Sequence, residues 1–276
     1  MPSPEPDVGR PEISICIPTF NGSMFLKQAL TPLLDSDPER VEIVVSDHGS
    51  TDGTRAVIHD AVGSRVRLLP GALSRELGAG ANWMRAVNAA RGRFVKILCQ
   101  DDVVTTALIY EQADRLQRNP SAAFCFSPVD VISSSGRALL RRRRLGRDLS
   151  GETDLVMALA RYGTNPIGEP VGVMFRREAI PAELELTEHF MLDLELYLEG
   201  LKYGPAVFLD APGAGFRVSG SSWSRSLERH QVLEAQSMIN RRLISQGMPP
   251  LSLVGRLRIR VGAFARRLLS WVGARC

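Results

Sequence analysis

Short apolar runs alternate along the first part of the chain with longer stretches in which apolar residues recur at helical spacing. The apolar runs, which predict strands, lie at 13–18, 41–46, 66–69 and 94–99. The stretches that predict helices lie at 23–35, 54–61 and 82–90. Strands separated by helices of this length are typical of right-handed βαβ units, which build a parallel sheet. We therefore predict an α/β fold with a mostly parallel sheet flanked by helices.

The pattern is less regular in the second half of the chain. A helix predicted at 106–118 ends before Asn119-Pro120. An apolar run at 122–132 predicts a strand, and further strands are expected at 171–175 and 206–209, with a helix between them at 191–201. Residues 133–151 are polar and include four consecutive arginines at 141–144. Such a run indicates either a solvated loop or hairpin, or a contact with an anionic acceptor or lipid phosphate.

Length and composition indicate one large domain. The chain has 276 residues, of which 44% are hydrophobic, and this is enough for a sizeable core. We expect a flexible N-terminus at 1–11, an α/β body at 12–222 and a C-terminal helical extension at 223–276. No apolar run approaches the roughly twenty residues that span a bilayer, and the N-terminus lacks the apolar segment of a signal peptide. The four cysteines have no metal-binding spacing, which favours buried thiols in the reducing cytoplasm.

The positive charge is concentrated in the last segment. Residues 251–276 contain six arginines and no acid, so this segment carries +6 against a total of +4 and the rest of the chain is −2. This distribution argues against nucleic acid as a partner. Apolar residues recur at helical spacing within the same segment, at Leu257, Val261, Phe264, Leu268 and Val272. A basic amphipathic helix of this kind lies in an anionic membrane interface, or packs on its own domain or on another copy of the chain in a homo-oligomer.

Two adjacent carboxylates, Asp101 and Asp102, follow the strand predicted at 94–99 with only Gln100 between. Neighbouring carboxylates raise each other's pKa unless a cation lies between them. Ligands of open α/β sheets bind outside the carboxyl ends of the strands. Carboxylate oxygens also suit Mg²⁺ or Mn²⁺. The pair therefore predicts a metal-assisted site, with capping of the next helix near Thr105 as the alternative.

Two more polar segments follow predicted strands, namely Pro18-Thr-Phe-Asn21 and the turn-rich stretch from Asp47 to Thr54. Together with the acid pair they resemble, in order and spacing, the motifs of the family 2 glycosyltransferases of the GT-A type. The resemblance covers roughly residues 13 to 220. It implies a nucleotide-binding half at 12–104 and an acceptor half at 105–222.

The resemblance implies a donor site for a nucleotide sugar, most specifically a UDP-sugar. Asp47 is expected to accept the imide N–H of uracil, whereas Asp52 has the alternative role of forming the turn before a helix. The segment 78–82 is expected either beside the donor or as a helix start with small residues for close packing. The positions that the resemblance places around the donor are Pro18, Thr19, Phe20, Asn21, Asp47, Asn82, Gln100 and Arg217.

The resemblance also assigns the chemistry. Asp101 is expected to be the primary metal ligand and Asp102 a supporting one, while Cys99 stands where the family has a further acid and is expected in the core. Ser219 stands where the family often has a histidine. Asp193, near the start of the helix predicted at 191–201, is the expected base of inverting transfer. Its alternative role is that of a solvated acid near a helix N-terminus.

These expectations describe a metal-dependent inverting glycosyltransferase with a saccharide or lipid-linked acceptor, active in polysaccharide or glycoconjugate biosynthesis. It is expected in the cytoplasm or on the cytoplasmic membrane face. Cys99 and Ser219 motivate an alternative, a nucleotide-sugar-binding or scaffold protein without catalysis. A nucleotidyltransferase is less favoured, because residues 18–22 lack the glycine-rich basic loop that this class needs after its first strand.

Overall fold

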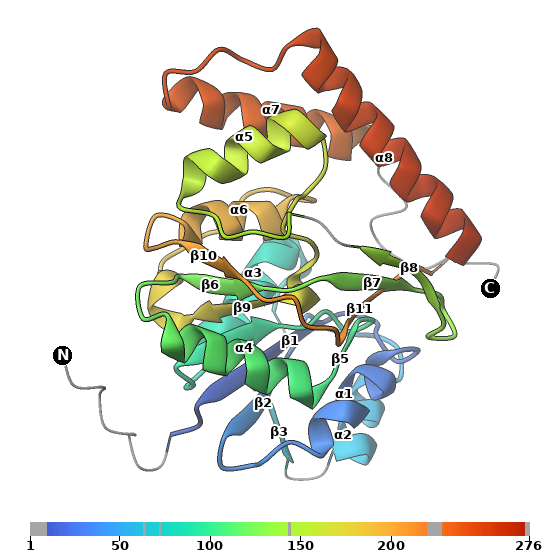
Figure 1. The fold of residues 1–276 in the computed structure, drawn as a ribbon. Coiled ribbons are helices and arrows are strands. Elements are labelled where there is room, and N and C mark those ends of the chain that lie inside the picture. Colours follow the sequence, from blue (N-terminus) through green and yellow to red (C-terminus); the bar gives the residue numbers. More distant parts are fainter. Residues whose placement is uncertain (1–9, 63–64, 72, 143–144, 220–227, 274–276) are drawn as a thin grey trace.

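A seven-stranded sheet forms the centre of the molecule (Figure 1). The computed structural model describes residues 10–62, 65–71, 73–142, 145–219 and 228–273. The strand order is β10-β6-β9-β4-β1-β2-β3. The strands are β1 (Ile13–Thr19), β2 (Val41–Asp47), β3 (Val66–Leu68), β4 (Phe94–Ile97), β6 (Phe124–Phe126), β9 (Val173–Arg176) and β10 (Ala206–Phe208). Only β9 runs antiparallel to its neighbours, β4 and β6, so the predicted α/β fold with a mostly parallel sheet is confirmed.

Helices cover both faces of this sheet (Figure 1). One face carries α1 (Leu26–Leu34), α2 (Thr54–Val62) and α4 (Thr106–Arg118). The other carries α3 (Gly78–Asn88), α5 (Glu152–Tyr162), α6 (Leu192–Gly200) and α7 (Glu228–Ser245). Successive side chains of a strand point to opposite faces. In β1, accordingly, Ile13, Ile15 and Ile17 enter the first core and Cys16 the second.

A second, four-stranded sheet has the order β5-β11-β7-β8. It consists of β5 (Val103–Val104), β7 (Val129–Ile132), β8 (Ala138–Arg142) and β11 (Ala214–Arg217). Strand β5 immediately follows the acid pair. Strands β7 and β8 pair antiparallel, so the hairpin reading of the arginine-rich segment is confirmed for Arg141 and Arg142. Residues 143–144 lie outside the described part of the chain.

The single strand predicted at 122–132 is wrong. The run divides into β6 and β7, which belong to different sheets. Pro128 stands between them and has no N–H to continue a ladder, which is why strands end or bend at such a residue. Before it, the Ser127 N–H donates to the carbonyl of Gly172 (2.9 Å).

Helix α4 begins and ends where the sequence predicts. Its N-cap is Thr105, whose Oγ1 accepts the N–H of Leu108 (3.3 Å). The cap is therefore a threonine and not the acid pair. Helix α3 begins at Gly78, four residues before the predicted start, so the segment 78–82 is a helix start. Gly80 has no room for a side chain against Leu186 and Leu192, which is the close packing expected of small residues there.

The C-terminal segment forms two helices, α7 and α8 (Leu253–Gly273), as the predicted helical extension requires. Helix α7 buries four side chains in the core that α3 and α6 also fill: Ala235, Met238, Ile239 and Leu243. Helix α8 packs on α5 and α7. Among the helices of the described residues, none has the length and apolar character needed to cross a membrane.

Candidate active site

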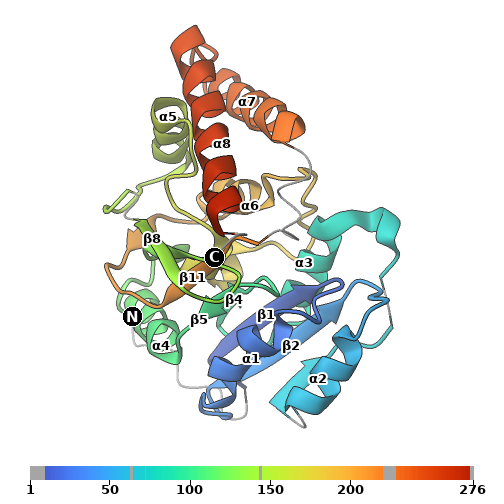
Figure 2. The ribbon, with the colours of Figure 1, turned by 90° about the vertical axis from the view of Figure 1, so that its right-hand side faces the viewer.

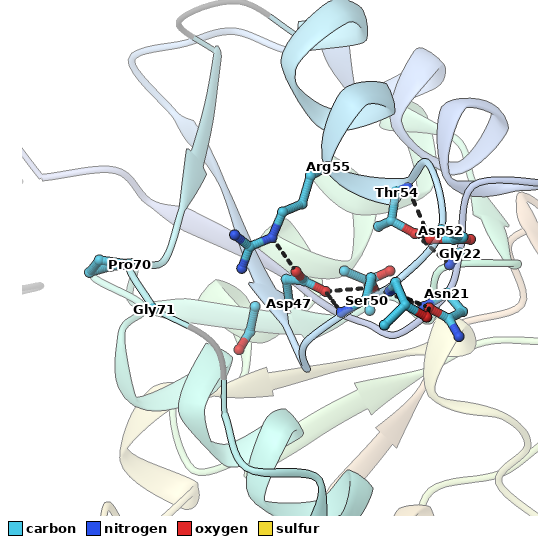
Figure 3. A network of polar contacts seen from close by, with 12 residues as sticks. Asn21, Gly22, Asp47, Ser50, Asp52, Thr54, Arg55, Pro70 and Gly71 are labelled. Atoms are coloured by element: carbon cyan, nitrogen blue, oxygen red, sulfur yellow. Dashed lines mark hydrogen bonds and ion pairs between the residues drawn. The ribbon is translucent and has the colours of Figure 1, made fainter.

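The carboxyl ends of β1 and β2 form the first part of the site (Figure 3). Thr19 and Asp47 are partners at the last position of the parallel ladder. After β1 the chain turns at Asn21, which has φ 49°, the one positive φ of a non-glycine residue in the described chain. Asparagine tolerates this conformation better than most residues. The turn is tied to the β2 loop, because Asn21 Oδ1 accepts the N–H of Thr51 (2.8 Å) and the Asn21 N–H donates to Ser50 Oγ (2.9 Å).

The Asp47 carboxylate lies at the centre of this turn and is almost fully buried. Its Oδ1 accepts two hydrogen bonds from Ser50, from the backbone N–H (3.1 Å) and from Oγ (2.6 Å). Its Oδ2 pairs with Nε of Arg55 (2.7 Å), whose side chain is 55% exposed. Burial raises the pKa of Asp47, but the hydrogen bonds from Ser50 and Arg55 outweigh burial and hold that pKa below its usual value. The group is therefore a carboxylate at neutral pH.

Asp52 shapes the same turn. Its Oδ1 accepts hydrogen bonds from the N–H and Oγ1 of Thr54, at the start of α2, and its Oδ2 accepts the N–H of Ser23 (3.2 Å). Burial opposes these bonds, yet they lower the pKa of Asp52 to about 2. These contacts agree with the turn-forming role.

Gln100 connects this turn to the acid pair. Its Oε1 accepts the N–H of Phe20 (2.8 Å) and its Nε2 donates to the Phe20 carbonyl (3.0 Å). The same Oε1 accepts a hydrogen bond from the hydroxyl of Thr19 (2.5 Å). A side chain at Gly22 would collide with the side chain of Gln100 in this position and would force it to move. The amide of Gln100 therefore holds the loop after β1 against the loop after β4.

Asn82, on α3, supports the loop from the other side and is buried. Its Oδ1 accepts the hydroxyl of Ser46 (2.6 Å), and its Nδ2 lies 3.4 Å from the carbonyl oxygen of Thr19. Asn82 thus links α3 to the ends of β1 and β2.

The acid pair rests on Arg217, at the end of β11. The Arg217 N–H donates to Oδ1 of Asp102 (3.0 Å), and its Nε donates to the carbonyl of Asp101 (2.7 Å). Its Nη1 donates to the carbonyls of Ser133 (3.1 Å) and Ser134 (2.9 Å). Arg217 is 1% exposed, and its guanidinium lies over the ring of Phe25. These contacts favour a structural role for Arg217, in which it holds the loop of Asp101 and Asp102 in place.

Burial dominates the electrostatics of the pair. It raises the pKa of Asp101, and Arg217 offsets part of that rise. The pKa of Asp102 lies well above its usual value because the carboxyl group is buried and Asp101 is beside it. Burial lowers the pKa of the Arg217 guanidinium, and the two carboxylates oppose that change. A cation beside Asp101 would lower the pKa of both acids and stabilise their charged forms.

The side chains around the acid pair suit a cation that is bound partly by the protein and partly by substrate phosphates. Among the described residues, no three His, Cys, Asp or Glu side chains gather closely enough to bind a metal by themselves. Asp102 and Ser219 are buried, whereas Asp101 is half-buried. Cys99 is also half-buried, so its expected place in the core is only partly correct. Mg²⁺ is commonly bound by one or two carboxylates, with substrate phosphates and water filling the other positions, and Asp101 with Asp102 fits that pattern.

Asp193 lies near the acid loop. Burial raises the pKa of the Cys99 thiol well above its usual value, and the charges of Asp102, Asp101 and Asp193 raise it further, so Asp193 is near enough to act on the same thiol as the acid pair. Asp193 Oδ2 accepts Nδ2 of Asn165 (2.7 Å). The nearby Glu195 instead accepts the N–H groups of Thr187 and Glu188, which binds it to the preceding loop. Asp193, unlike Glu195, is therefore not bound to the loop that precedes α6 by these two hydrogen bonds.

Two residues of the site carry no motif in the sequence. Asn165 fixes Asp193, and Glu169 is close enough to raise the pKa of Asp102. Both belong to the segment between α5 and β9, which has no apolar period. The run Asn165-Pro166 and the glycine at 168 signal a turn there, but they do not indicate which side chain the turn would contact.

Comparison with known proteins shows the family of the chain. The profile of the family described as Glycosyl transferase family 2 matches residues 14–182, more than half of the chain. An uncharacterized protein of Mycobacterium tuberculosis, MT1568, is 31% identical over 178 residues, which is 61% of this chain and 54% of the relative. The succinoglycan biosynthesis protein ExoO of Rhizobium meliloti is 30% identical over 129 residues, 47% of this chain and 36% of its own. The chain therefore spans about half or less of the length of these curated relatives.

Solved structures show the same fold at low sequence identity. The S. aureus protein TarS, residues 1–349, in complex with UDP-GlcNAc, superposes with a TM-score of 0.61 at 14% identity, covering 94% of this chain and 81% of TarS. The mannosyltransferase PcManGT of Pyrobaculum calidifontis, in complex with GDP-Man and Mn²⁺, gives 0.57 at 14% identity, covering 96% and 74%.

Proposed function

The chain belongs to glycosyltransferase family 2, and we propose that it transfers a sugar from a UDP-sugar to a hydroxyl group, with inversion at the anomeric carbon. One observation carries the proposal. Gln100 joins the loop after β1, which faces Asp47, to the loop that holds Asp101 and Asp102. A base at Asp47 and a diphosphate at Asp101 would then occupy one continuous edge of the sheet.

The hydrogen bonds of Asp47 favour uracil over guanine. Each carboxylate oxygen has about two lone pairs. Both lone pairs of Oδ1 are used by Ser50, so a base can reach only Oδ2, on the side of the exposed Arg55. Uracil offers a single imide N–H, whereas guanine offers two N–H groups side by side that need both oxygens. The proposed donor is therefore a UDP-sugar, with the Arg55 side chain moving aside as the base enters.

We propose that Asp101 is the first ligand of Mg²⁺ or Mn²⁺ and that Asp102 supports it from the buried side. The ion would stabilise the charge of the departing diphosphate. Arg217 binds the carbonyl of Asp101 and also the carbonyls of Ser133 and Ser134 after β7, so its proposed role is to position Asp101 and Asp102.

The acceptor hydroxyl is assigned to the Asp193 side of the loop. Its oxygen attacks the anomeric carbon while the bond from that carbon to the diphosphate oxygen breaks. Asp193 takes the hydroxyl proton, as a general base must do on the face opposite the leaving group. A saccharide or lipid-linked acceptor is proposed because the relative ExoO is named for succinoglycan biosynthesis.

One experiment distinguishes the proposed role of Asp101 from that of Asp193. Asp101→Asn, Asp193→Asn and the control Asp114→Asn, on the exposed surface of α4, are compared for hydrolysis of UDP-sugars and for thermal shift by UDP with and without Mn²⁺. We expect Asp101→Asn to lose the Mn²⁺-dependent part of the shift. Asp193→Asn should keep the shift while its rate falls by about 10²–10⁴-fold. The control should match the parent protein.

The same experiment decides between catalysis and binding alone. A chain that binds UDP-sugars but hydrolyses none of them would be the inactive binding protein suggested by Cys99 and Ser219. Hydrolysis that is unaffected in both site variants would remove the assigned roles of Asp101 and Asp193. A larger thermal shift with GDP than with UDP would remove the assignment of the base.

A further inference from the structure

Helix α8 carries a row of large apolar side chains that are mostly exposed in the described part of the chain. Five residues of its first three turns are between 56% and 85% exposed: Leu253, Val254, Leu257, Val261 and Phe264. An α-helix advances about 100° per residue, so these positions lie on one side of the helix. We call these five residues the outer face of α8. Monomeric soluble proteins rarely expose a contiguous apolar surface of this kind without a partner.

The opposite side of α8 is the side that packs. Ile259 is 2% exposed, and Gly255 lies against Leu251 and the carbonyl of Ala160. Gly262 lies against Gly163 and Thr164, where a side chain would collide. Gly163, in turn, closes α5 in the left-handed conformation and touches the backbone of Arg258. The contact with α5 thus fixes which side of α8 faces outward.

The position of α8 leaves its outer face accessible. Figure 2 shows α8 in front of α5 and α7, and no other element crosses it in that view. The five side chains of the outer face are at least 56% exposed, so this face is a surface of the described molecule.

Arginines border this face on both sides. On the helix, Arg258 follows the face on one side, and Arg260 and Arg256 follow it on the other. All three are exposed, and Arg258 also donates to the carbonyl of Arg161 (3.0 Å). No acid occurs from Leu251 to the end of the sequence. An apolar strip bordered by arginines on both sides fits a surface that is apolar within and negatively charged at its rim.

We propose that the outer face of α8 docks on a bilayer containing anionic phospholipids. The apolar side chains would enter the acyl boundary, and the arginines would meet lipid phosphates at the level of the headgroups. A second copy of this chain is a poorer occupant. In a symmetric dimer built on this face, the bordering arginines would lie close to the arginines of the other copy, with no acid of α8 to pair them.

Flotation of the full chain with lipid vesicles tests this surface. The parent protein should float with vesicles of phosphatidylcholine and phosphatidylglycerol, and much less with phosphatidylcholine alone. The triple variant Leu257→Glu, Val261→Glu and Phe264→Glu should lose binding. Its fold should be unchanged, because these side chains are already exposed. Arg256→Gln with Arg260→Gln should weaken binding roughly tenfold or more.

The matched control is Leu233→Glu with Ile244→Glu, on α7. These two side chains are 61% exposed, as much as those of the triple variant, and should be dispensable. The proposal is wrong if the parent does not float, if it binds neutral vesicles equally well, or if the control loses binding as the triple variant does. It is also wrong if the parent is a dimer in solution that the triple variant makes monomeric. Binding is the readout, so the result does not depend on transferase activity.

Discussion

At the scale of single residues, the proposed base is positioned by a neighbour that does not react. Asn165 is itself fixed by its loop, because its Oδ1 accepts the N–H groups of Ile167 (3.0 Å) and Gly168 (3.1 Å). Its Nδ2 then donates to the Gly168 carbonyl (2.8 Å) and to Asp193 Oδ2 (2.7 Å). One carboxylate oxygen of Asp193 is thereby held in place.

Replacing Asn165 by alanine should therefore lower the rate of transfer with little effect on donor binding. We expect kcat to fall about tenfold or more, because a misplaced base loses part of the gain of general base catalysis. Steady-state kinetics and a UDP thermal shift measure the two effects separately. Asn119→Ala is the control, since its Nδ2 caps a backbone carbonyl of α4 (2.8 Å) away from the site. Equal kinetics in the two variants would contradict the role of Asn165.

The sequence predicts the acids of the site better than their supports. Asp47 and Asp101 lie at the ends of clear apolar strand runs, so their edge of the sheet can be predicted, whereas Asp193 is assigned by the resemblance. Which groups hold them depends on side-chain hydrogen bonds between distant segments. Gln100 and Arg217 illustrate this point: the resemblance assigns both to the donor, while in the structure both are bonded to the backbone of the site loops.

At the scale of elements, one lysine joins three of them. Lys96, on β4, is fully buried, and its Nζ donates to Oε1 of Gln112 on α4 (2.8 Å) and to the carbonyl of Val173 on β9 (3.1 Å). Burial lowers the pKa of Lys96 from 10.5 to about 7. The helix, the central strand and the antiparallel strand are thus linked by a group whose charge is costly in the folded state.

Lys96 should make stability depend on pH above neutrality. Between about pH 7 and pH 10.5 the unfolded chain holds a proton at Lys96 that the folded chain has released, so stability rises with pH. Relative to Lys96→Met, the free energy of unfolding of the parent should increase by about 1–3 kcal/mol from about pH 7 to about pH 9. Urea denaturation at both pH values measures the difference. The exposed Lys27→Met is the control, and a constant difference for Lys96→Met would contradict the expectation.

The elements that the sequence fails to predict share a physical cause. β6 and β7 form one apolar run, and only Pro128 marks the point where the chain changes sheets. β11 includes Gly215, which packs against Val103 and Ile132, so close packing instead of a strand pattern defines it. In contrast, α4 has both a cap and a clear apolar period and is predicted to the residue. Local signals decide an element only where tertiary packing does not override them.

At the scale of the molecule, the two cores lie on opposite faces of one sheet and share its strands. Phe124 and Phe126 of β6 enter one core, and Cys125 between them enters the other. Helix α7, which lies in the predicted extension, buries Met238 and Ile239 in the core that contains Phe124 and Phe126. The C-terminal helices are therefore expected to unfold together with the sheet.

This cooperativity is open to a direct test. Leu30→Ala on α1 and Met238→Ala on α7 remove fully or almost fully buried side chains from opposite cores. Each should lower the free energy of unfolding by about 2–5 kcal/mol, because both leave a cavity in a packed interior. Since the cores share strands, each variant should still unfold in one transition, with circular dichroism and tryptophan fluorescence coinciding. Leu233→Ala, exposed on α7, should change stability by less than about 0.5 kcal/mol. A separate early transition in Met238→Ala alone would show that α7 folds apart from the sheet.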